Sequence, residues 1–558
     1  METLTMINMK KQTIAILLLA AFAADAGAQT VADALRFSDN NYYGTARSIS
    51  MGNAFTALGG DLGSISLNPA GSAVNNFSQA TLTPNISIIS SSAKYNAMPS
   101  IADMFGPATK NNTTRFTMPN VGTIINMNTG NKIGLKSISF GIVANASANY
   151  IDDVAASGRN KSTTYAGYLA DKSAGINSAS INDNAYYNTD IPWQTIVGCQ
   201  SMLISNYNSN NGDYIGVTEK ATDMGSGKYD ISLPDAIDQR YGRRSHGNKY
   251  DIVFNIGANI SDRFFVGANL GVTSIDYSMN QYFKEIAVNP DSFQIDMADN
   301  AGNVQTTYFN QLRSKYSYDA DGAGVYAKFG FIAVPVQGLR VGAAIQTPTA
   351  NFITKHWQLA GETYYKSSNF DISAQSPRGE YKYKFVSPYR VNVGVAYTFG
   401  SFGVVSADYE LCDYSTMKFS ETETNDNSAF ESVNGDIKNF AGAAHMLRLG
   451  AAHMLRLGAE LKVLPSFAVR AGYNFSTSGE RDFENDVKKT PKAYRTAISG
   501  GLGYSSKGSF FCDLAVRGTK FPYKYIYLYD TYIKDAFSPK IQYRKRIWDV
   551  VMTFGWRF

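Results

Sequence analysis

The sequence is poor in cysteine, in charge and in long apolar runs. Its 558 residues include three cysteines, Cys199, Cys412 and Cys512. An odd number of widely spaced cysteines excludes a disulfide framework and a CxxC metal site. Charged residues make up 17% of the chain and the net charge is +5. That charged fraction is below the quarter typical of soluble domains, and the net charge is too small to indicate a nucleic-acid partner.

Transmembrane helices are not expected. The longest apolar run, residues 14–24, has 11 residues, whereas a spanning helix needs about 20. Lys10 and Lys11 precede this run, and Ala26-Gly27-Ala28 follows it, which is the pattern of a signal peptide with its cleavage site. We expect residues 1–28 to direct export, and any membrane span to consist of strands.

Catalytic motifs are also missing. Four histidines occur, His246, His356, His445 and His453, and the sequence has neither a G-x-S-x-G elbow nor an H-E-x-x-H motif. The stretch 225–228 (GSGK) lacks the residues that the phosphate-binding loop motif requires before and after it. We therefore expect no enzyme activity, no metal and no cofactor.

What the chain does contain is period-two alternation in segments of about ten residues, typical of strands that cross a bilayer. In the last segment, Trp548, Val550 and Met552 alternate with Asp549 and Thr553. Fourteen such segments predict an all-β fold, a transmembrane antiparallel β-barrel over residues 80–558, in preference to a soluble sandwich. The expected strands are residues 80–91, 117–128, 136–149, 249–259, 263–278, 322–334, 339–349, 385–399, 402–415, 446–463, 467–476, 493–504, 509–518 and 545–558.

The connections alternate between short and long, as in bacterial outer-membrane barrels with short periplasmic turns and long external loops. One strand carries a tandem octapeptide, AAHMLRLG at 443–450 and again at 451–458. We expect the first copy to protrude into a loop. The long connections are expected near residues 92–116, 150–248, 279–321, 350–384, 416–445, 477–492 and 519–544.

Residues 29–79 do not alternate and suggest a compact plug ahead of the barrel. The run ARSISMGNAFTALGGDLGSISLNPAG at 46–71 resembles the N-terminal hatch of the FadL/TodX family of outer-membrane transporters for hydrophobic compounds. Asn-Pro followed by Gly is ordinary turn chemistry by itself. Together with the signal peptide, the fourteen strands and a terminal Phe558, it supports the resemblance.

The resemblance implies a fourteen-stranded barrel with a small N-terminal hatch in its lumen and passive uptake of long-chain fatty acid-like or aromatic compounds. It further implies that the hatch shifts and that cargo leaves sideways near the third strand. The candidate residues for hatch and gating are Arg47, Gly52, Asn53, Asn68, Pro69, Ala70 and Gly71, with Arg47 and Asn53 binding the hatch to the wall. For the lateral exit they are Gly141, Val143 and Asn145.

Other partners and functions stay open at this point. Candidate contacts to lipopolysaccharide are Arg243, Arg244, Arg544, Lys545 and Arg546. Phe558 would be recognised by the barrel-assembly machinery. We expect the protein to be a monomer in the outer membrane. The alternatives are a haem-binding receptor, suggested by tyrosines near 525–532, a surface receptor or adhesin anchored by the barrel, and a channel-forming porin.

Overall fold

The computed structural model describes residues 30–96, 106–187, 191–207, 212–225, 227–298, 303–424, 426–442, 451–477, 494–506, 508–533 and 536–558. The predicted signal peptide and the first octapeptide copy lie outside these residues. None of the described helices is long and apolar enough to cross a membrane.

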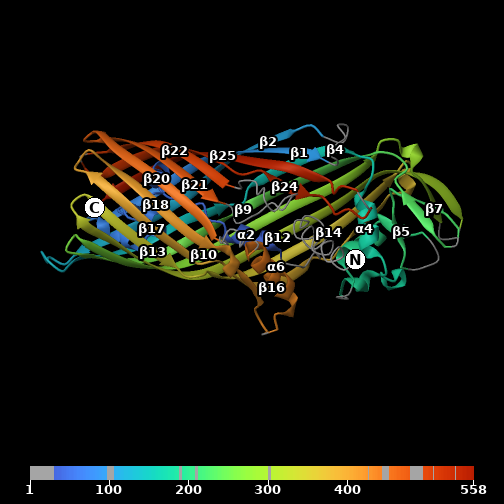
Figure 1. Ribbon diagram of the computed structural model, residues 1–558, viewed down its shortest axis with the longest axis horizontal. Coiled ribbons are helices and arrows are strands. Elements are labelled where there is room, and N and C mark those ends of the chain that lie inside the picture. Colours follow the sequence, from blue (N-terminus) through green and yellow to red (C-terminus); the bar gives the residue numbers. More distant parts are fainter. Residues whose placement is uncertain are drawn as a thin grey trace, which may run out of the picture.

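Fourteen antiparallel strand positions form a closed barrel, which confirms the predicted fold class (Figure 1). β1 pairs with both β2 and the last strand β25, so the sheet has no free edge at this seam. Two wall positions are each shared by two segments, β13 with β14 and β16 with β17, because Pro348 and Pro388 lack the N–H needed to continue the ladder. The wall segments are β1 (Gln79–Asn96), β2 (Thr109–Asn128), β3 (Leu135–Asn149), β9 (Ile237–Ile260), β10 (Phe264–Ala287), β12 (Val304–Val336), β13 (Leu339–Gln346), β14 (Ala350–Tyr365), β16 (Gly379–Val386), β17 (Arg390–Phe399), β18 (Gly403–Asp413), β20 (Ala451–Leu464), β21 (Phe467–Thr477), β22 (Tyr494–Ser505), β23 (Phe510–Lys520) and β25 (Lys540–Arg557).

The two faces of the wall differ sharply in polarity. On β25 the outward Trp548 is 53% exposed, whereas the inward Asp549 is fully buried. Outward apolar side chains continue on the neighbouring strands, for example Leu514 on β23 and Ile88 on β1. An apolar belt around a polar interior is the surface of a barrel that spans a membrane.

The two ends of the barrel differ in their connections. Turns at 261–263, 337–338 and 400–402 join strands at one end, where Phe558 donates its backbone N–H to the Ser78 carbonyl at 3.0 Å. The long connections gather at the opposite end. Short turns mark the periplasmic end of such barrels, so the long connections are external.

The external strand ends extend far beyond the predicted ones. Residues 279–321 and 350–384, predicted as loops, are largely strand: β10 and β12 stay paired as far as Ile286 and Gln311. The reason is that the strands leave the lipid. Outward positions become polar, as at Asp276 and Asn280, so the lipid-facing half of the alternation disappears while the ladder continues.

The N-terminal segment lies inside the barrel as four short helices. Each begins at a residue whose side chain accepts a hydrogen bond from a backbone N–H of the first turn: Thr30, Thr45, Asp61 and Asn68. Short helices of this kind are not stable alone, so packing against the wall must hold them. They are α2 (Val31–Ser38), α3 (Ala46–Ser50), η1 (Leu62–Ser66) and η2 (Pro69–Val74).

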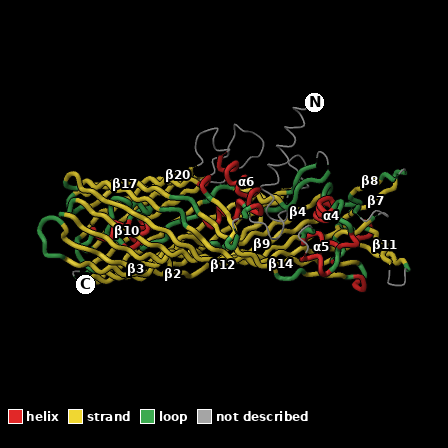
Figure 2. Tube along the Cα trace, turned by 90° about the horizontal axis from the view of Figure 1, so that it is seen from below, coloured by secondary structure: helices red, strands yellow, loops and turns green. Residues whose placement is uncertain are grey.

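The external connections add further elements, the largest group between β3 and β9. Figure 2 shows α4 and α5 at the external end of the barrel and α6 beside the wall. These elements are β4 (Asp152–Asn160), α4 (Tyr165–Ser173), η4 (Ser178–Ser180), η5 (Asp183–Tyr187), α5 (Trp193–Gln200), β5 (Ile204–Asn206), β6 (Tyr214–Gly216), β7 (Lys220–Asp223), β8 (Tyr229–Ser232), η6 (Pro290–Ser292), β11 (Gln294–Ala298), η7 (Ser368–Phe370), β15 (Ile372–Gln375), η8 (Tyr414–Thr416), β19 (Lys418–Glu421), η9 (Ser428–Phe430), α6 (Glu431–Gly442) and β24 (Lys524–Tyr527).

Candidate functional site: the hatch and a break in the wall

Residues 30–78, called the hatch below, are bound to the wall by cations that donate to hatch carbonyls. Lys328 Nζ donates to the Ser66 carbonyl at 2.6 Å, and Arg340 Nη1 to the Leu58 carbonyl at 2.7 Å. Hydrogen bonds from charged donors are about twice as strong as neutral ones. The wall therefore supplies charged donors to backbone carbonyls of the hatch.

Ion pairs add to this attachment. Arg47 of α3 meets Glu460 of β20 at 2.9 Å, and Glu460 also accepts from Arg470 at 2.5 Å. Asn53 differs from its expected role, because its amide donates to the Tyr42 carbonyl at 2.8 Å within the hatch rather than to the wall. Its backbone is in the left-handed region (φ 60°), which turns the side chain back onto the hatch.

The Asn68–Gly71 turn is fixed on several sides. The Asn68 amide donates to the Phe331 carbonyl of β12 at 2.9 Å, and its Oδ1 accepts from the Ala70 N–H at 3.1 Å. Asn255 of β9 donates to the Pro69 carbonyl at 3.0 Å. A Cβ at Gly71 would lie 2.8 Å from Ser64 Oγ, so this turn is also packed tightly against η1.

Gly52 lies where the hatch backbone closely approaches β20 and β21 of the wall. Its φ is +63°, a conformation that glycine adopts without strain. A Cβ there would lie 2.7 Å from the Leu457 carbonyl of β20. Glycine is therefore required both by the backbone conformation and by the space available.

The wall is interrupted beside the hatch, between the second and third strand positions. The β2–β3 ladder runs from Asn128↔Ser137 to Asn120↔Asn145, while β2 continues to Thr109. The residue just above the last pair is Pro119, which has no N–H to donate to a ladder. We call the stretch above Asn120↔Asn145 the wall break.

Above the wall break the chain of the third strand leaves β2. It continues as β4, which pairs with β9, and Ser91 Oγ on the lumen side of β1 donates to the Asp153 carbonyl. Asn111 of β2 reaches Asp153 through its side-chain amide, which donates to Oδ1 at 3.2 Å and to the carbonyl oxygen at 3.5 Å. A side-chain contact thus replaces a backbone ladder at this point of the wall.

The three residues expected at a lateral exit all face the lumen just below the wall break. Val143 is fully buried against Leu62 and Ile65 of the hatch. Asn145 belongs to the last ladder pair and donates to Ser66 Oγ at 2.7 Å. Gly141 presents no side chain to this contact. Hatch, third strand and wall break are therefore adjacent.

A cavity lies between part of the hatch and the strands β20 to β25 of the wall. Polar side chains from both sides line much of it, and Met454, Phe521 and Ile547 add apolar surface. The lining residues are Asn41, Tyr43, Gly52, Asn53, Met454, Asn474, Arg495, Ala497, Ser499, Arg517, Thr519, Phe521 and Ile547.

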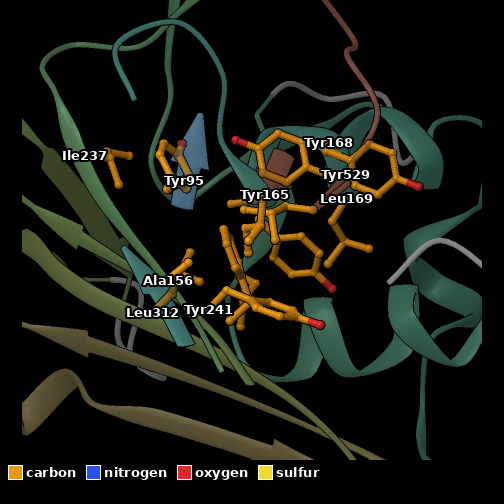
Figure 3. Close-up of a cluster of buried hydrophobic side chains, with 14 of the residues drawn as sticks. Tyr95, Ala156, Tyr165, Tyr168, Leu169, Ile237, Tyr241, Leu312 and Tyr529 are labelled. Atoms are coloured by element: carbon orange, nitrogen blue, oxygen red, sulfur yellow. The ribbon is translucent and has the colours of Figure 1, made fainter. Parts of the chain in front are cut away.

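The external half of the barrel contains a tyrosine-rich core built around α4 (Figure 3). Tyr165 and Tyr168 of α4 pack on Tyr529, with ring centroids 6.3 and 5.8 Å apart. The tyrosines near 525–532, considered above as haem ligands, include Tyr529, which is fully buried and donates to the Thr163 carbonyl at 3.0 Å. In this structure Tyr529 serves packing.

A buried carboxyl lies beneath α4. Glu285 accepts from the Tyr165 N–H at 2.7 Å and from Gln239 Nε2 at 2.7 Å. It lies on β10 eleven residues beyond Ser274, where the outward face has become polar, and so outside the lipid belt. Burial raises the pKa of the Glu285 carboxyl to about 7, with a further contribution from Glu219, although its hydrogen bonds lower the pKa.

Docking of α4 is expected to weaken as pH rises. The Glu285 pKa is about 7 when α4 is docked and about 4.3 when the group is in water. The raised pKa therefore stabilises docking fully below the lower value, and this contribution is lost as pH rises through the higher one. Hydrogen-exchange protection factors of the α4 amides should fall by up to about tenfold per pH unit between about pH 5 and 7. Glu285→Gln should abolish this pH dependence, and an unchanged slope in the variant would contradict it.

The candidate lipopolysaccharide residues divide between the two faces of the wall. Arg243 faces the lumen and pairs with Asp152 at 3.3 Å, and Lys545 donates inward to the Ile151 carbonyl at 2.7 Å. These two predictions are corrected, since side chains one residue apart on a strand point to opposite faces. Arg244, Arg544 and Arg546 face outward.

Comparison with known proteins gives structural similarity only. Neither a protein-family model nor a curated protein sequence matches the chain. Among solved structures it is similar to a Pseudomonas aeruginosa FadL homologue, with 12% identity, 93% of this chain and 99% of that chain covered, and a TM-score of 0.47. It is also similar to the Ralstonia pickettii toluene transporter TbuX, with 12% identity, 93% of this chain and 99% of that chain covered, and a TM-score of 0.45. A CymD monoaromatic hydrocarbon channel is similar as well, with 12% identity, 92% of this chain and 98% of that chain covered, and a TM-score of 0.46.

Proposed function

We propose that this chain is a passive outer-membrane transporter of hydrophobic small molecules of the FadL/TodX type, with long-chain fatty acid-like or aromatic cargo. The observation that carries the proposal is the position of the wall break. It lies beside Val143 and Asn145, which contact the hatch directly. A shift of the hatch would therefore act on a stretch of the wall where the β2–β3 backbone ladder is missing.

The physical problem is that apolar molecules cross the polar sugar layer of the outer leaflet poorly. A closed lumen with a side exit solves it, because cargo enters from outside and reaches the membrane interior without crossing the periplasmic end. No nucleotide-binding motif occurs in the sequence, so transport would be driven by the cargo gradient. Export by residues 1–28, assembly through Phe558 and a monomeric state belong to the same proposal.

Locking the wall break is expected to stop uptake and leave binding intact. The side chains of Asn111 and Asp153 touch across the break, so N111C and D153C, in a chain with Cys199, Cys412 and Cys512 changed to Ser, should form a disulfide on oxidation. Uptake of radiolabelled oleate by cells should fall at least about tenfold and return with a reductant. Tryptophan fluorescence of the purified barrel should show the same saturable oleate binding in both redox states.

The matched control is a disulfide at S90C and N112C, which are paired where the β1–β2 ladder is continuous. Oxidation of this pair should not affect uptake. Equal uptake by the locked and reduced N111C/D153C forms would overturn the lateral route. Hemin binding with a Soret shift, in the absence of oleate or toluene binding, would favour a haem receptor, and binding of none of the three would favour a surface receptor.

A further inference from the structure

Cations gather on one part of the outer surface, across four neighbouring strands. Lys520 of β23 is paired in register with Arg546 of β25. One level further out, Arg544 of β25 is in register with Ser92 of β1, which is itself paired with Lys110 of β2. All four cationic side chains point outward, and we call Lys110, Lys520, Arg544 and Arg546 the basic face.

The basic face begins where the lipid-facing belt ends. Trp548, two residues after Arg546 on β25 and on the same outward face, is 53% exposed, and Ile88 in register with it is 40% exposed. Two strand residues span about 7 Å. The first cations thus lie about one headgroup layer beyond the last large apolar side chains, on the external side.

The basic face is not part of a uniform ring around the barrel. At the corresponding level of the opposite wall, one step beyond the outward Phe352, Asp276 of β10 is paired with Asp321 of β12. Among the described outward residues of β23, β25, β1 and β2 at the levels of the basic face, none is acidic. The opposite wall also carries the outward Lys382 of β16 at this level, in register with Thr354. Its charges are therefore mixed, whereas those of the basic face are of one sign.

Arg544 is held in place within the basic face. Its guanidinium lies 5.2 Å from the ring centroid of Tyr523 and donates to the Tyr523 hydroxyl at 2.9 Å. A guanidinium presents donors in a fork that fits phosphate oxygens, and the contact with Tyr523 holds this one at the outer surface.

We propose that the basic face binds lipid A, the bisphosphorylated glycolipid of the outer leaflet, through its phosphates. The cations extend over three strand spacings, on the order of 14 Å, and over two levels. That spread suits two phosphates on one disaccharide rather than the single phosphate of a phospholipid. The basic face adds a lipid partner to the proposed function, and its Lys110 lies on β2 beside Asn111, at the edge of the wall break.

Native mass spectrometry of the detergent-purified full chain tests the assignment, with bisphosphoryl lipid A and phosphatidylglycerol as probes. The variant K110Q/K520Q/R544Q/R546Q should bind lipid A at least about tenfold more weakly, because four charged donors to the phosphates are lost and tenfold corresponds to only about 1.4 kcal/mol. Phosphatidylglycerol binding should change by less than about threefold. The substituted side chains point outward, and heat-modifiable mobility on gels checks that the variant barrel is folded.

The matched control removes cations from the opposite wall. Lys382 and Lys384 of β16 are in register with Thr354 and Phe352, at the levels of Asp321 and the outer edge of the lipid belt. K382Q/K384Q should bind lipid A as the unmodified chain does. Equal lipid A binding by the basic-face variant and the unmodified chain would overturn the assignment, as would phosphatidylglycerol binding as tight as that of lipid A.

Discussion

A barrel lacking residues 31–74 is expected to conduct ions in a planar bilayer, whereas the full chain should be nearly silent. The deletion removes all four hatch helices and leaves a lumen lined by side chains such as Lys249, Lys328 and Arg390. These cations lose their hatch carbonyls but gain water, and polar, water-filled lumens are normal in barrels of this kind. Stepwise conductance in single-channel recordings is the expected result.

The outer insertion provides the control. Asn160 and Ile237 are directly paired in register, so residues 161–236 can be replaced by a two-residue turn. That variant should stay silent, because the hatch still fills the lumen at the level of the lipid. If the hatch-deleted barrel were folded but did not conduct ions, sealing by the hatch would be contradicted. Ion conduction by the full chain would favour a porin.

A milder change to the hatch is the double substitution P69A/G71A. It should make the hatch more sensitive to protease.

Removing the Glu410 carboxylate is expected to destabilise the barrel by about 3–5 kcal/mol, the cost typical of breaking a buried ion pair. Glu410 is 1% exposed; it accepts from Arg390 at 2.7 Å and also pairs with Arg456. Arg390 in turn donates to the Ser38 carbonyl of the hatch at 2.6 Å. Glu410→Ala would leave two buried guanidiniums without their shared anion. Reversible urea unfolding in lipid bilayers measures the change.

An exposed ion pair serves as the comparison. Glu380 lies 3.2 Å from Lys382, and its side chain is 51% exposed. Pairs of this kind contribute about 0–1 kcal/mol, so Glu380→Ala should change the free energy of unfolding only within that range. If both substitutions had the same small effect, the buried network would not be a source of stability.

The number of strands could be predicted because each strand carries its own apolar outward face while it is in lipid. The same parity also predicts which way each side chain points. Arg243 has the odd parity of the inward Asp251, and Lys545 that of the inward Asp549. The alternation therefore predicts an inward orientation for both, in conflict with their expected contact with lipopolysaccharide.

Other features could not be derived from local patterns. Pro119 marks the end of the β2–β3 ladder, but nothing in the sequence shows that β4 then pairs with β9 instead of β2. Glu285 contacts the N-terminus of α4 across 120 residues of chain. The conformation of Asn53 depends on hatch packing. Each of these depends on contacts distant in sequence, which period-two alternation does not encode.

The unequal lengths of the strands have a consequence for how molecules arrive at the cell surface. β12 has 33 residues and β10 has 24, whereas β21 and β23 have 11 each (Figure 1). At about 3.3 Å per residue, the side of the wall formed by β10 and β12 extends tens of ångströms beyond the side formed by β21 and β23. Molecules diffusing through the sugar layer would therefore meet the protein from a preferred direction, well before they meet the lipid.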